Sequence, residues 1–217
     1  MEYSWNVDRF WRKTRSKYSD NADCFGVDIN RNFHYKWGKI GSTDDPCHDV
    51  YHGPKAGSEP ETRAFQHFVN ENLPNIKSYL SFHSYGEMVL YPWQYDWKDS
   101  DDYFQLYRVG SAMQRKVKNQ SQRDYRLGSG GKTIYRVGGS SMDWMHNLGI
   151  IHTYTIELSP ENENENGFEI DPKLIEVVGQ YALIMTQIVL EMTRICDVEL
   201  LCDPRVRQIY PDEFLYD

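Results

Sequence analysis

The chain has 217 residues, which is the length of one ordinary domain to one and a half, so we expect a single folded unit with a sizeable core. Hydrophobic residues make up 40% of the chain and aromatic residues 14%, which excludes an intrinsically disordered protein. The 24 Lys and Arg residues against 32 Asp and Glu residues give a net charge of −8, so a broad nucleic-acid-binding face is not expected.

No uninterrupted apolar run approaches the ~18 residues of a membrane-spanning helix, and the first residues lack the apolar core of a signal peptide. We therefore expect no membrane association and no export signal within this chain. The four cysteines, at positions 24, 47, 196 and 202, lack the spacing of a zinc finger. One or two disulfides are expected instead. Because disulfides form mainly in exported proteins, this expectation is inconsistent with the missing export signal.

The elements predicted by local patterns alternate between helices and short strands. Residues 1–57 show little periodicity, so loops and short elements are expected there. Ser58 followed by Glu61 is a capping box, which predicts a helix over residues 59–71. The other predicted elements are strands over 76–83 and 88–92 around a turn at 84–87, a helix over 101–118, a glycine-rich loop over 127–139, a short helix from 140 to 146, an apolar strand over 152–158 and a long helix from 172 to about 195. This alternation predicts an α/β protein with helices covering the sheet.

Several common catalytic motifs are excluded. Residues 131–133 resemble the end of a phosphate-binding P-loop, but the first glycine of that motif would fall at Arg126. The sequence also contains no G-x-S-x-G, G-x-G-x-x-G or H-E-x-x-H pattern. Serine hydrolase, dinucleotide-binding and zincin hypotheses therefore lose their main support.

Three polar positions remain as candidates for chemistry. Arg31 beside Asn30 can hold a carboxylate by charge-assisted hydrogen bonds, although an ordinary polar turn accounts for the same residues. His83 lies at the end of a predicted strand, where it is either a metal ligand or a structural histidine. Glu157 interrupts an apolar strand, so its carboxylate must pair with a cation, stay protonated or take part in a reaction.

Eight sequence segments occur in an order and at separations that resemble the zinc metallocarboxypeptidases of the pancreatic carboxypeptidase A/B type. They are residues 11–15, 26–32, 51–53 with 58–59, 81–85, 90–92, 133–135, 138–144 and 154–158. The resemblance runs from about residue 5 to residue 195 and corresponds to the later two-thirds or so of that family's catalytic domain. It implies a carboxypeptidase-like mixed β-sheet flanked by helices on both faces, with the early strands of the domain missing.

The resemblance also implies roles for single residues in the reaction. His83 would be the third zinc ligand, and Glu157 would be the general base that deprotonates the zinc-bound water. Arg12 would stabilise the oxyanion. A carboxylate in an apolar strand agrees with a base whose pKa is tuned by its surroundings.

The implied substrate contacts lie in three different segments. Asn30, Arg31 and Tyr135 would hold the terminal carboxylate of a peptide or protein substrate. Met142 occupies the position that decides specificity in the family, where members specific for basic residues carry an acid. An apolar residue there implies a preference for aliphatic or aromatic C-terminal residues.

One expected motif has no counterpart in this chain. The family's other two zinc ligands lie in an H-x-x-E motif upstream of the segment that matches residues 11–15, so only His83 of the three ligands is present. Asp28 orients the missing histidine in the family and loses that partner here. Because zinc catalysis normally uses three protein ligands, the chain alone is not expected to cleave peptides.

Three hypotheses follow for the whole molecule. The first is an N-terminally truncated, monomeric, extracellular metallocarboxypeptidase, with residues 1–195 as a partial catalytic domain and residues 196–217 as an acidic extension. Cys24 and Cys47 fall where the family has a disulfide, and truncation would explain the missing export signal. The second hypothesis is an inactive remnant that binds the C-terminal carboxylates of peptides. The third is a truncated product that folds poorly because the edges of its sheet are unpaired.

Overall fold

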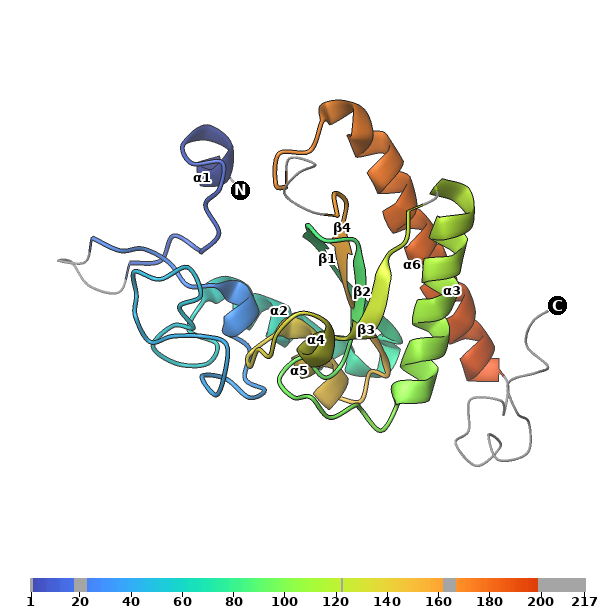
Figure 1. The fold of residues 1–217 in the computed structure, drawn as a ribbon. Helices are drawn as coiled ribbons and strands as arrows, with labels where there is room; N and C mark the ends of the chain where they lie inside the picture. The colour runs from blue at the N-terminus through green and yellow to red at the C-terminus, as the bar shows by residue number, and fades with distance from the viewer. Residues whose placement is uncertain (1, 18–22, 122, 162–166, 199–217) are drawn as a thin grey trace.

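The centre of the protein is one mixed four-stranded sheet, seen in a computed structural model that describes residues 2–17, 23–121, 123–161 and 167–198 (Figure 1). The strands are β1 (Ser78–Ser84), β2 (Met88–Tyr91), β3 (Arg126–Ser129) and β4 (His152–Leu158). Their order is β1-β4-β2-β3; β1 pairs in parallel with β4, and β2 pairs antiparallel with β4 and in parallel with β3. The predicted α/β class is therefore confirmed, and β4 lies between the two strands that flank the turn at residues 84–87.

Helices cover both faces of this sheet. The helices are α1 (Glu2–Asn6), α2 (Pro60–Asn72), α3 (Tyr103–Ser121), α4 (Gly130–Thr133), α5 (Ser141–Asn147) and α6 (Ile175–Val198), with 3-10 turns η1 (Ile29–Arg31), η2 (Leu73–Asn75) and η4 (Pro172–Leu174). In Figure 1, α3 and α6 lie side by side on one face, and α2 and α5 lie on the other. The predicted flanking of a mixed sheet on both faces is confirmed.

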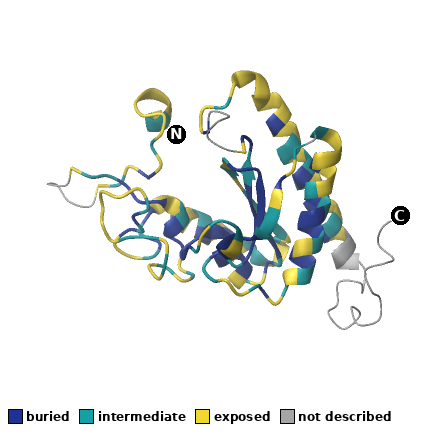
Figure 2. Cartoon of the chain, in the orientation of Figure 1, coloured by how far each residue is buried: buried dark blue, intermediate teal, exposed yellow. Residues whose placement is uncertain are grey.

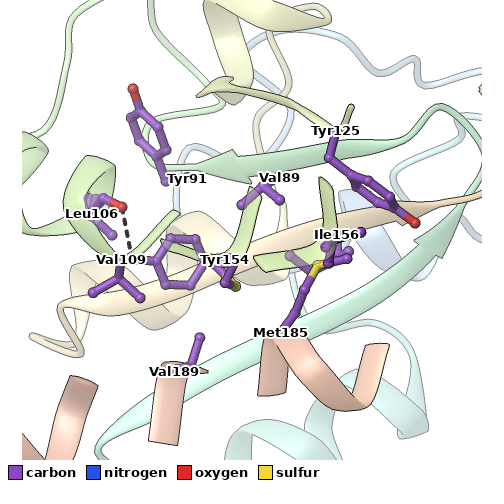
Figure 3. Close-up of a cluster of buried hydrophobic side chains, with 11 residues drawn as sticks. Val89, Tyr91, Leu106, Val109, Tyr125, Tyr154, Ile156, Met185 and Val189 are labelled. Carbon is purple, nitrogen blue, oxygen red and sulfur yellow. Dashed lines mark hydrogen bonds between the residues drawn. The ribbon is translucent and has the colours of Figure 1, made fainter. Parts of the chain in front are cut away.

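The larger part of the core lies between the sheet and the α3–α6 pair (Figure 3). Val89 of β2 and Ile156 of β4 are fully buried against Met185 of α6. The hydroxyl of Tyr154 is also buried here, and it donates a hydrogen bond to the carbonyl of Leu106 at 3.1 Å, which ties β4 to α3. A buried phenol needs such a partner, so this bond fixes the helix against the strand.

A second buried cluster fills the opposite face, between the sheet and the α2–α5 pair. Phe33, Val69, Trp144, Met145 and Ile150 form this cluster. Figure 2 shows the same division, with buried positions on the strands and on the inner sides of the helices. Because side chains alternate along a strand, β1 contributes to both clusters and its backbone is held between two apolar layers.

Two local predictions are wrong in detail. The stretch at residues 127–139 is not wholly a loop, because it begins in β3 and continues as α4. Gly128 permits this strand because the side chain of Thr133 occupies the space where a Cβ would stand. At α2 the N-cap is Glu59 without a side-chain cap bond, and the Ser58 hydroxyl donates to the Glu59 Oε1 atom at 2.9 Å instead.

Helix α6 is more apolar than the short length of its uninterrupted apolar runs indicates. Within the described residues, the segment Pro172–Arg194 is long and apolar enough to meet the length and composition of a membrane span, and 17% of its apolar 18-residue stretch is buried. The expectation that no segment has this composition is therefore wrong. In the structure Val178, Met185 and Val189 of this helix are buried, and Met185 and Val189 belong to the core cluster.

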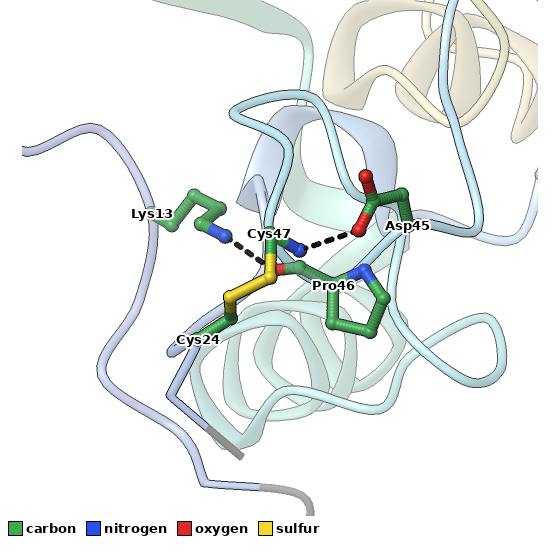
Figure 4. The surroundings of a disulfide bond; sticks show 5 residues. All are labelled: Lys13, Cys24, Asp45, Pro46 and Cys47. Carbon is green, nitrogen blue, oxygen red and sulfur yellow. Dashed lines mark hydrogen bonds between the residues drawn. A yellow bond between two sulfur atoms is a disulfide. The ribbon is translucent and has the colours of Figure 1, made fainter.

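A disulfide links Cys24 to Cys47 (Figure 4), as the family resemblance implies. Lys13 donates to the carbonyl of Pro46 at 2.7 Å, and the Cys47 N–H donates to Asp45 Oδ1 at 2.9 Å. The bond from Lys13 joins two chain segments next to the disulfide, and the bond within residues 45–47 fixes the turn that holds Cys47. The side chain of position 196 and all of residues 199–217, which hold most of the predicted acidic extension, lie outside the described residues.

Candidate functional site

A cavity of about 380 Å³ opens beside β1, between the 3-10 turn η1 and helix α2. Its lining residues come from five segments of the chain. They are Arg12, Asp28, Ile29, Asn30, Phe33, Glu61, Phe65, Tyr79, Ser81, His83 and Ser141. Three of the predicted site residues, Arg12, Asn30 and His83, therefore lie around one space.

The strongest polar contact in the cavity joins Arg12 to Asp28. The Arg12 Nε and Nη2 atoms lie 2.9 Å and 2.7 Å from the Asp28 Oδ2 atom. Burial alone would lower the pKa of Arg12. The charge and the hydrogen bond of Asp28, with smaller contributions from Tyr135 and Glu157, outweigh burial, so the pKa of Arg12 is raised. In this structure Asp28 thus holds the guanidinium of Arg12, where the family resemblance gives it a histidine.

His83 stands on β1 next to this ion pair. Its Nε2 atom lies 2.8 Å from the hydroxyl of Ser81, two residues earlier on the same strand. Burial, together with the positive charge of Arg12, lowers the pKa of His83 to about 4. The imidazole is therefore neutral at pH 7, which is the form that can bind a metal ion.

Glu157 lies opposite His83 on the neighbouring strand. The two residues are register partners in the parallel pairing of β1 with β4, so their side chains leave the sheet on the same side. Burial raises the pKa of Glu157 to about 7, while Arg12 opposes this shift. A carboxyl group with that pKa can both accept and release a proton near neutral pH.

The polar segment around η1 divides into residues that face the cavity and residues that hold the loops. Asp28 caps the turn by accepting the Asn30 N–H at 3.0 Å, and Asn30 lines the cavity. Arg31 is only 2% exposed and donates to the carbonyls of Gly41 and Asn30 at 2.9 Å and 3.0 Å. It is not one of the cavity-lining residues, so its predicted grip on a substrate stays a prediction.

The two other residues predicted to contact the substrate, Tyr135 and Met142, differ in their exposure to solvent. Tyr135 is 55% exposed and close enough to Arg12 to affect its pKa. Met142 is completely buried and does not line the cavity, whereas its neighbour Ser141 does. Sequence reasoning missed Ser141, because only its spatial approach to residues near position 30 gives it a place in the site.

The residues present do not complete a zinc site. Among the residues described, no group of three or more His, Cys, Asp and Glu side chains is arranged to hold a metal ion. His83 offers one imidazole, and the carboxylate of Asp28 is already paired with Arg12. Three protein ligands are the usual minimum for catalytic zinc, so these side chains do not fit the metal on their own.

Comparison with known proteins identifies the relatives of this chain. The zinc carboxypeptidase family matches residues 1–183. Mast cell carboxypeptidase A of Rattus norvegicus is 40% identical over 166 residues, which are 76% of this chain and 40% of that protein. Carboxypeptidase B of Canis lupus familiaris is 37% identical over 182 residues, 84% of this chain and 43% of that protein. The chain thus spans about two-fifths of the length of these curated relatives.

Solved structures agree with this assignment. Bovine thrombin-activatable fibrinolysis inhibitor, in complex with tick carboxypeptidase inhibitor, superposes with a TM-score of 0.84 at 32% identity, covering 89% of this chain and 66% of that one. Carboxypeptidase A of Helicoverpa armigera also gives a TM-score of 0.84, at 29% identity and with 91% and 49% covered. The fold of these proteins therefore extends over nearly all of this chain.

Proposed function

The chain belongs to the zinc carboxypeptidase family, and from this premise we propose that it provides the substrate-binding and proton-transfer part of a metallocarboxypeptidase, which hydrolyses the C-terminal peptide bond of peptides or proteins. The observation that carries the proposal is the position of Arg12, which lines one cavity with His83, the register partner of Glu157. One cation thus adjoins a candidate metal ligand and a candidate base.

Each residue has a definite task in this proposal. Glu157 takes a proton from the attacking water and passes it to the leaving amine, which its pKa of about 7 supports. Arg12 stabilises the negative charge that develops on the scissile carbonyl oxygen. Asn30, with Arg31 and Tyr135, holds the terminal carboxylate. Zinc is the family's metal, and its ligands besides His83 would have to lie outside the described residues.

The side chains that line the cavity suggest which C-terminal residue the substrate carries. Ile29, Phe33, Phe65 and Tyr79 supply apolar and aromatic surface, which supports a preference for apolar or aromatic C-terminal residues. Met142 is buried and does not line the cavity, so it would contribute to that preference only through its packing against the residues that do. The disulfide between Cys24 and Cys47 supports an extracellular location, and we propose that the protein acts there as a monomer.

The test is release of phenylalanine from a peptide that ends in Phe, measured with the protein isolated from its natural source. We expect release from the free acid, no release from the C-terminal amide, and loss of release after zinc is removed by a chelator. The intact mass of that protein, compared with 25.6 kDa for this chain, tests the proposed truncation. No release from the free acid in the presence of zinc would refute the proposed hydrolysis.

A second candidate function is binding of peptide C-termini without cleavage. It is favoured by the finding that the described residues hold no group of three metal-ligating side chains, while Asn30 and Arg12 still line the cavity. An NMR titration of this chain with a Phe-terminated peptide and with its amide distinguishes the two ligands. Tighter binding of the acid supports this function, and equal affinity for acid and amide contradicts it.

A further inference from the structure

The side-chain amide of Asn30 is held by a residue far away in the sequence. Its Oδ1 atom accepts two hydrogen bonds from Ser141, one from the backbone N–H at 2.9 Å and one from the hydroxyl at 3.2 Å. The two residues are 111 positions apart, and neither contact was predictable from local pattern. Both residues line the cavity described above.

The chemistry of these contacts decides which end of the amide faces the cavity. A backbone N–H can only donate, so the Asn30 atom opposite it must be the carbonyl oxygen and not the NH2 group. The NH2 group is therefore directed to the other side of the amide. We infer that Ser141 is a positioning residue, which orients Asn30 so that its two N–H donors are presented to the carboxylate of a bound peptide.

The backbone around both residues makes this arrangement rigid. Asp28 accepts the Asn30 N–H and fixes the turn. Ser140 is the N-cap of α5 and accepts the Asp143 N–H, which leaves the Ser141 N–H among the first helix amides that have no acceptor inside the helix. Gly139, with a positive φ of 76°, lets this helix start come close to the turn, because a Cβ there would collide with the carbonyl of Arg31.

The orientation matters because the opposite one would repel the substrate. A reversed amide would turn its carbonyl oxygen toward the substrate carboxylate, and two acceptors without a proton between them do not bind. The inference thus deepens the proposed function and rests on it: Ser141 acts on carboxylate recognition through Asn30.

The test compares a peptide acid with its amide. Acetyl-Gly-Phe and acetyl-Gly-Phe-amide are titrated by NMR into the wild-type chain and into Ser141→Ala, Asn30→Ala and the double variant. Losing one of the two bonds to Oδ1 should weaken binding of the acid about threefold, and losing the whole Asn30 amide about tenfold, with the amide peptide unchanged. The double variant should bind the acid no more weakly than Asn30→Ala, because Ser141 acts through Asn30.

Two controls separate positioning from general damage. Ser141→Thr keeps a hydroxyl and should restore acid binding. Ser140→Ala removes the neighbouring helix cap, so it should lower the melting temperature yet keep the ratio of acid to amide affinity. Should Ser141→Ala leave that ratio unchanged while Asn30→Ala lowers it, the Ser141 hydroxyl has no positioning role and the proposed function stands.

A measurement without substrate tests the orientation of Asn30 by Ser141 separately from the proposed recognition of a carboxylate. A scalar coupling across the hydrogen bond, between the Ser141 amide nitrogen and the Asn30 side-chain carbonyl carbon, reports the orientation directly. Absence of this coupling in the folded protein would overturn the inference, even if the acid binds better than the amide. Equal affinity of the wild-type chain for acid and amide would instead contradict the proposed carboxylate recognition, with the coupling still testing how the amide is oriented.

Discussion

Replacing Asp28 by Asn is the perturbation whose effect follows most directly from the geometry. The Asp28 side chain is 5% exposed, and its Oδ2 atom accepts two bonds from the guanidinium of Arg12 and lies 3.6 Å from Arg31. Removing one partner of a buried ion pair costs about 3–5 kcal/mol. Because the Arg12 side chain is 42% exposed and can regain water, we expect the lower end, about 3 kcal/mol.

Thermal and urea unfolding measure this loss. For a chain of this size, about 3 kcal/mol corresponds to a fall of roughly 6–12 °C in the melting temperature. The control is Asp99→Asn, because Asp99 pairs with Lys132 at 2.6 Å with side chains 36% and 50% exposed, and such a pair contributes less than about 1 kcal/mol. Equal shifts for the two variants, or a loss of less than about 1 kcal/mol for Asp28→Asn, would mean that the buried ion pair does not stabilise the fold.

Three further predictions concern other parts of the fold. Because the pKa of Glu157 is raised to about 7 from 4.5, its contribution to stability is complete below pH 4.5 and is lost as the pH rises through 7. Glu157→Gln should remove this decline in urea titrations, and an unchanged slope would contradict it. Replacing Cys24 and Cys47 by Ser opens a loop of 23 residues and should cost about 3 kcal/mol, measured against the reduced wild type as a control. Met185→Ala, at a fully buried position, should cost about 2–5 kcal/mol in the same assay, and a loss below about 1 kcal/mol would mean that the core refills the cavity.

The positions of most helices and strands are predictable because their signals are local. Ser140 caps α5, and the apolar run at His152–Leu158 forms β4, as their patterns predict. Strand β3 is missed because Gly128 weakens the strand pattern, and its role depends on Thr133 filling the space beside it. The order of the strands is not predictable from periodicity, because β4 reaches its place between β1 and β2 through contacts distant in sequence.

The candidate site is predictable only where a residue is unusual in its own surroundings. Glu157 is identified by its place in an apolar strand, and Asn30 by the density of polar groups around it. That His83 and Glu157 are register partners follows from the parallel pairing of their strands, which no local pattern contains. The inferred role of Ser141 depends on a contact between residues 111 positions apart, so the spacing of residues in the sequence does not predict it.

The contacts of Asn30 and His83 indicate that the proposed carboxylate binding and the proposed metal binding are separable in this molecule. Asn30 is fixed by Asp28 and Ser141, whereas His83 is held by Ser81 on β1. The two groups are joined through Arg12, which is paired with Asp28 and lowers the pKa of His83. The Asn30 side of the cavity, where we propose that the carboxylate binds, can therefore be in place without a metal, and changes to Arg12 should affect both Asn30 and His83.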